Sequence, residues 1–129
     1  MATPTLRSSL GRAVGLGSAK EGVAHWWAQR ITALALVPLT LWFVVAIVAL
    51  AGADRAMFVE WVRNPLPAVL LVLLLVATFY HAALGLQVVI EDYIENMALR
   101  LALLIVMRLA AIVLVVRGVF AVLKLSFGA

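Results

Sequence analysis

Three long apolar stretches, separated by short polar breaks, dominate the pattern of hydrophobic and polar positions along this chain. They run from about 31 to 53, 68 to 90 and 98 to 122, and each exceeds the roughly 20 residues that an α-helix needs to cross a bilayer. A backbone in lipid must satisfy its own hydrogen bonds, so apolar segments of this length form helices. The pattern predicts an all-α membrane protein with three transmembrane helices, surrounded by the lipid bilayer.

The polar segments predict how the chain lies in the membrane. Residues 1–29 form an arm that is rich in basic residues and ends in Trp26 and Trp27, a residue type enriched at the lipid headgroups. The loop around 52–67 carries balanced charge, and a short acidic turn follows the second stretch at 91–96. By the positive-inside rule, the arm and the acidic turn are cytoplasmic. We therefore expect a bacterial inner (cytoplasmic) membrane; a transit peptide and the mitochondrial inner membrane are the alternative that we set aside.

Composition narrows the function classes further. Hydrophobic residues make up 67% of the chain and charged residues 12%, whereas soluble domains are about one quarter charged. We expect residues 1–129 to form a single membrane-anchor domain. The net charge of +4 is spread over the arm and the helix ends, so it predicts no nucleic-acid binding. The absence of cysteine excludes disulfides and thiolate ligands.

His81, in the second apolar stretch, is the most informative residue. Ionisable side chains inside a membrane usually face a bundle interior, a cavity or a cofactor. A neutral imidazole is a common axial ligand of haem iron, and Gly85 lies one turn away on the same helical face, where it would leave room for a flat macrocycle. The alternative is a histidine that hydrogen-bonds a neighbouring helix, with Gly85 as a small-residue packing point.

Asp92 and Tyr93 come at the end of the same helix, about 17 Å from His81 by helical rise. A tyrosine hydroxyl at the membrane surface can donate a hydrogen bond to a quinone carbonyl, although tyrosine is also common in the aromatic belt. Arg30 is expected on the same side, where it could pair with Asp92 or hold a haem propionate; otherwise it is a snorkelling anchor. His25, on the wet edge, could relay protons or bind a propionate.

Arg108 lies near the middle of the third stretch, where an arginine costs at least about 2.5–3.5 kcal/mol to insert. It should therefore face a partner, a polar cofactor edge or trapped water. Counted from the acidic turn, His81 and Arg108 lie at similar depths, and we expect them to line one polar cavity.

Two blocks of the sequence resemble the smaller cytochrome b membrane anchor of succinate dehydrogenase (complex II), the anchor of type D. They are Gly22–Ala33 (GVAHWWAQRITA) and His81–Tyr93 (HAALGLQVVIEDY), and the Ala98–Leu101 entry to the third stretch is also similar. The larger anchor, type C, carries a His-x-x-x-Gly-x-Arg-His run. Gly85–Val88 lacks that Arg-His pair, so the sequence is closer to the type D anchor.

The resemblance implies a role for each site residue. His81 would be an axial ligand of haem b, with the other ligand from a type C cytochrome b anchor subunit, and Gly85 would line the haem. Tyr93 would hydrogen-bond ubiquinone with Asp92 beside it, and Arg30 would lie near the propionates and the quinone.

The resemblance also implies partners. The chain would form half of a heterodimeric six-helix haem-binding bundle and receive electrons from succinate through a flavoprotein subunit and an iron–sulfur subunit. It would itself carry no succinate-oxidising site. Ala24 and His25 stand where some members have a His-Asp order. A haem-free structural anchor, or an unrelated small bundle such as a transporter subunit, is the alternative function.

Overall fold

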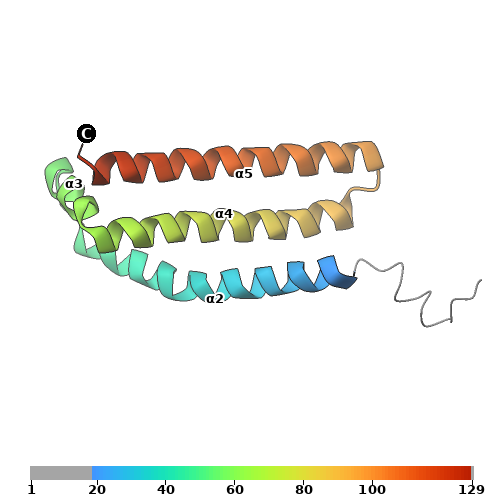
Figure 1. The fold of residues 1–129 in the computed structure, drawn as a ribbon, viewed down its shortest axis with the longest axis horizontal. Helices are drawn as coiled ribbons and strands as arrows, with labels where there is room; N and C mark the ends of the chain where they lie inside the picture. Colours follow the sequence, from blue (N-terminus) through green and yellow to red (C-terminus); the bar gives the residue numbers. More distant parts are fainter. Residues whose placement is uncertain (1–18, 129) are drawn as a thin grey trace, which may run out of the picture.

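The computed structural model describes residues 19–128, and within this range the regular secondary structure is helical. Three long helices lie side by side with α4 in the middle, and a short helix packs across one end (Figure 1). The helices are α2 (Ala19–Ala49), α3 (Arg55–Arg63), α4 (Pro65–Tyr93) and α5 (Met97–Ser126). α2, α4 and α5 are each long and apolar enough to cross a membrane. The predicted three transmembrane helices are confirmed. Residues 1–18 of the predicted arm lie outside the described residues.

The predicted helix bounds were wrong by several residues. α2 begins at Ala19, inside the expected arm, and ends at Ala49 instead of about 53. α4 and α5 extend beyond the expected 68–90 and 98–122 at both ends. Hydropathy marks only the part of a helix that fits the hydrocarbon, whereas backbone hydrogen bonds continue through the headgroup layer. α2 stops early because the chain turns at Gly52, whose φ of 82° suits glycine.

The loop expected around 52–67 contains a helix, α3. The Asp54 side chain caps it by accepting a hydrogen bond from the Met57 amide at 2.8 Å. Val62 is 1% exposed where α3 packs against α4 and α5, and the Trp61 ring stacks on Trp42 of α2 with centroids 5.9 Å apart. α3 therefore closes the end of the bundle away from Tyr93.

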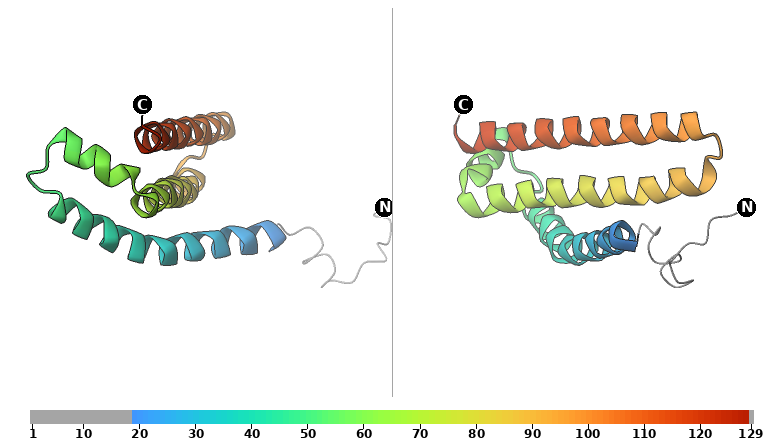
Figure 2. Two further views of the ribbon diagram at one scale, coloured as in Figure 1. Left: turned by 60° about the vertical axis from the view of Figure 1, so that its left-hand side comes forward. Right: turned by 45° about the vertical axis from the view of Figure 1, so that its right-hand side comes forward.

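The interior of the described chain is small. Its buried apolar side chains are Ala46, Val62, Ala68 and Leu84. α4 and α5 run antiparallel and α2 is inclined to them (Figure 2). The remaining apolar surface is available to lipid, because apolar side chains in a bilayer need not be buried inside the protein.

Candidate functional site

His81 lies on the part of α4 that faces α2. Its Nδ1 is 2.9 Å from Oγ1 of Thr32, a residue of α2. The same Oγ1 lies 2.7 Å from the backbone carbonyl oxygen of Ala28, one turn earlier in α2. The imidazole is half-buried. Nε2 makes no hydrogen bond to any residue in the described range, so one nitrogen of the ring is tied to α2 and the other is not.

Gly85 lies one turn further along α4. A Cβ built there would meet a single neighbour among the described atoms, Nε2 of Gln29 at 3.9 Å, which is an ordinary contact. Gly118 is the contrasting case, because a Cβ there would come within 3.1 Å of a Leu75 methyl group on α4. The packing of this chain thus explains a glycine at 118 but not at 85, and space beside His81 is left free.

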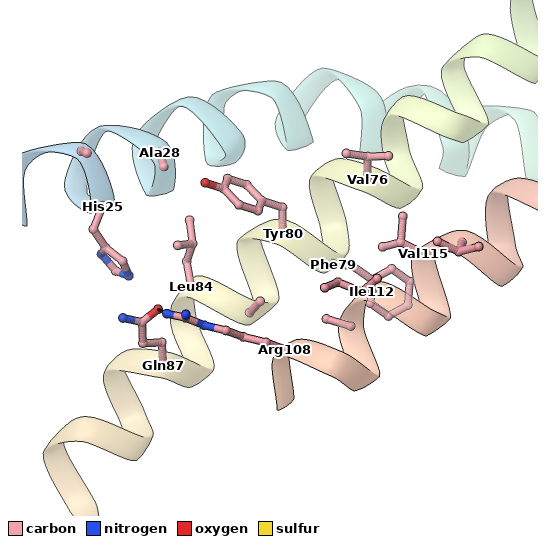
Figure 3. Close-up of a pocket in the computed structure, with 14 residues that line it drawn as sticks. His25, Ala28, Val76, Phe79, Tyr80, Leu84, Gln87, Arg108, Ile112 and Val115 are labelled. Carbon is pink, nitrogen blue, oxygen red and sulfur yellow. Dashed lines mark hydrogen bonds between the residues drawn. The ribbon is translucent and has the colours of Figure 1, made fainter. Parts of the chain in front are cut away.

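A groove of about 780 Å³ lies between α2, α4 and α5. Its polar lining residues are His25, Tyr80, Gln87 and Arg108, and the rest of its wall is apolar (Figure 3). Nη2 of Arg108 donates to Oε1 of Gln87 at 3.1 Å. Nε2 of Gln87 in turn donates to the Glu91 carboxylate at 3.0 Å.

The Gln87 amide therefore links a cation in the apolar stretch of α5 to a carboxylate near the end of α4. Arginine can only donate and an ionised carboxylate can only accept, so the two contacts fix which way the amide points. The expectation that Arg108 faces a polar partner is confirmed. The expectation that it shares a cavity with His81 was wrong, because His81 is turned toward Thr32 and does not line this groove.

His25 lies in the Arg108 groove. Its ring points from α2 toward Gln87 and the Arg108 guanidinium (Figure 3). Nε2 of His25 is buried with no hydrogen-bond partner among the described residues. The structure thus separates the two histidines, with His25 on the Arg108 groove and His81 bound to Thr32.

Asp92 and Tyr93 are the last residues of α4, at the end of the helix that carries His81, as the sequence predicts. The Tyr93 side chain is 80% exposed, so its hydroxyl is open to another molecule. Arg30 does not pair with Asp92, because the one ion pair of the described chain joins Arg63 to Glu60. The Arg30 guanidinium lies over the Trp26 ring, 5.1 Å from its centroid, a cation–π contact.

Sequence reasoning missed Thr32 and Gln87. Threonine is unremarkable in an apolar helix, so no polar anomaly points to Thr32, and its contact depends on how α2 lies against α4. Gln87 offered a signal, because an uncharged amide one turn before Glu91 in an apolar helix is a candidate partner for a membrane arginine.

Replacing Gln87 by leucine is expected to lower the thermal stability of the protein, because Arg108 then keeps its charge but loses its hydrogen-bond acceptor. Leaving such a donor unpaired costs on the order of 1–3 kcal/mol. The double variant Gln87→Leu/Arg108→Leu should recover most of that loss, since replacing both partners of a pair by apolar groups is often nearly neutral. Residual folded protein after heating in detergent measures both effects; additive losses in the double variant would refute the pairing.

Comparison with known proteins adds independent information. Residues 4–116 match the family described as succinate dehydrogenase/fumarate reductase transmembrane subunit. The chain is 38% identical over 120 residues to a succinate dehydrogenase hydrophobic membrane anchor subunit of Rickettsia bellii, and the match covers 93% of this chain and 96% of the relative. It is 29% identical to the protein of the same name from Paracoccus denitrificans, over 91% of this chain and 90% of the relative. A succinate dehydrogenase membrane anchor subunit of Reclinomonas americana is 28% identical over 72% of this chain and 80% of the relative.

Proposed function

Because the chain belongs to the succinate dehydrogenase/fumarate reductase transmembrane-subunit family, and its relatives are hydrophobic membrane anchors of succinate dehydrogenase, we propose that it anchors that enzyme in a bacterial inner membrane, helps to bind haem b and forms part of the ubiquinone-reduction site. Electrons from succinate would pass from the iron–sulfur subunit to ubiquinone. The chain is a subunit of the enzyme, and the oxidation of succinate belongs to other subunits.

The placement of His81 carries the haem part of the proposal. An axial ligand needs one ring nitrogen free, and Nδ1 is the nitrogen engaged by Thr32. Gly85, one turn away, has a single neighbour at 3.9 Å, so a flat group could lie against α4 there without displacing this chain. No three histidine, aspartate or glutamate side chains gather anywhere in residues 22–128. His81 would therefore supply one ligand, and the type C anchor subunit would supply the other.

When bound at His81, haem b would supply a one-electron carrier within the membrane. The residues of this chain would hold it: His81 as ligand, Gly85 as an open wall, and Arg30 toward the propionates. Arg30 is exposed beyond its contact with Trp26 and keeps donors for an anionic group. His25 lines the Arg108 groove, and this position gives no support for a direct contact between His25 and the same haem.

The end of α4 supports the quinone part of the proposal. A quinone carbonyl needs a hydrogen-bond donor at the membrane surface, and the exposed Tyr93 hydroxyl can donate to it. Asp92, also exposed, lies beside it and can take up protons from water for the reduced quinone. We place this end and the amino terminus on the cytoplasmic side, where the iron–sulfur and flavoprotein subunits would dock.

Affinity purification through a tag on this chain, from native membranes in mild detergent, tests the anchor role. We expect a flavoprotein, an iron–sulfur protein and a second small membrane subunit to copurify in equal amounts, with succinate-oxidising activity toward an artificial acceptor. The same tag on an unrelated three-helix membrane protein is the control. Recovery of the chain with transport proteins, or without any succinate-oxidising activity, would contradict the proposal.

A further inference from the structure

We propose that Thr32 is a positioning residue that fixes the tautomer of His81, so that Nδ1 carries the proton and Nε2 presents its lone pair to the haem iron. This inference rests on the proposed haem-binding function. It assigns a part to a residue of α2 that is not itself a ligand.

The hydroxyl of Thr32 has one proton and three close neighbours. The Ala28 carbonyl oxygen lies at 2.7 Å, the Gln29 carbonyl oxygen at 3.1 Å, and Nδ1 of His81 at 2.9 Å. Carbonyl oxygens only accept, so the contact at 2.7 Å needs the hydroxyl proton. The lone pairs of Oγ1 then remain for His81, and Nδ1 must be the donor.

The opposite arrangement leaves a close contact without a proton. If Thr32 donated to an unprotonated Nδ1, its oxygen would lie 2.7 Å from the Ala28 carbonyl oxygen with no hydrogen between them. Nε2 of His81 would then carry the proton and could not bind iron, because a ligating nitrogen must offer its lone pair. Geometry on α2 thus selects the tautomer on α4.

Thr32 is well suited to hold the ring in place as well. Threonine is β-branched and stiff at χ1, and in a helix its hydroxyl commonly bonds the carbonyl four residues earlier, as it does here with Ala28. Contacts within α2 therefore hold Oγ1 of Thr32, the acceptor, in position independently of the imidazole. Hydrogen bonds to the outer nitrogen of a ligating histidine orient the ring and make the ligating nitrogen more basic. A more basic ligand favours the ferric state of the haem.

Thr32→Val in the intact complex tests the proposal, because valine keeps the shape and removes the hydroxyl. We expect weaker haem retention, on the order of 10-fold in affinity, a higher haem midpoint potential and a changed ferric-haem resonance spectrum. Thr32→Ser restores a hydroxyl and should return all three readouts toward the wild type. Thr40→Val, at an exposed position of the same helix, is the matched control and should change none of them.

Assembly is followed separately by flavin content and by succinate oxidation with an artificial acceptor, and Thr32→Ala is the second variant if the valine variant assembles poorly. A haem-containing wild type whose potential and resonance spectrum are unchanged in Thr32→Val and Thr32→Ala would overturn the role of Thr32 alone. A wild-type complex without haem b would overturn it together with the haem part of the proposed function.

Discussion

His81→Ala is expected to remove haem b from the assembled complex almost completely. The ratio of haem to flavin should fall from its wild-type value to near zero. The variant removes the ligand that we propose this chain supplies to the haem iron. The histidine is half-buried and has one hydrogen-bond partner, Thr32, in the described structure. Truncation should therefore leave no large internal cavity, and the three helices should still assemble with the other subunits.

The ratio is measured by extracting haem and flavin from the same purified sample. His25→Ala is the control, since its ring lines a groove that His81 does not enter, and it should retain the haem with its axial ligation unchanged. Haem that stays bound in His81→Ala with unaltered ligation would contradict the ligand role. Loss of the haem in both variants would indicate that the Arg108 groove also affects haem binding.

Tyr93→Phe is expected to lower the rate of ubiquinone reduction by about 10-fold, while succinate oxidation with an artificial acceptor stays near the wild-type rate. The hydroxyl would donate to the quinone, and one lost hydrogen bond worth about 1.4 kcal/mol corresponds to a factor of 10. Because the side chain is 80% exposed at the end of α4, the helix itself should tolerate the change.

The two rates are measured on one preparation, so that subunit content cancels from their ratio. Tyr80→Phe is a matched control, because Tyr80 is the other tyrosine of α4 and lines the Arg108 groove. Its ratio of rates should not change. Equal loss of both rates in Tyr93→Phe would indicate damage to the complex, and an unchanged quinone rate would remove Tyr93 from the quinone site.

Hydropathy predicted the three spans well because burial in lipid leaves a signal in every residue of a span. It could not predict where the helices end, since α2 continues through polar residues back to Ala19. It also missed α3, because the nine residues of this helix carry both charged and apolar side chains, a mixture that is typical of a polar loop. The buried Val62 shows that tertiary packing against α4 and α5 stabilises this short helix.

The sequence predicts a site residue well where its chemical type is unusual for its segment. It predicts contacts less well where they depend on how two helices pack against each other. His81 and Arg108 were noticed because ionisable groups are rare in apolar stretches. The expectation of a common cavity compared the depths of the two residues in the membrane, but not the directions in which their side chains project around the helix axes. His81 and Gln87, the partner of Arg108, are six residues apart and project from α4 about 120° apart around its axis. Thr32 gave no signal, because its contact depends on the register between α2 and α4.

A reduced-minus-oxidised visible spectrum of the complex, purified through a tag on this chain, tests the central claim most directly: that the chain is a haem-binding anchor of succinate dehydrogenase. We predict the absorption bands of a b-type haem, reduced when succinate is added. A flat spectrum from a complex with full flavin content and succinate-oxidising activity would contradict haem binding and leave the chain as a haem-free anchor.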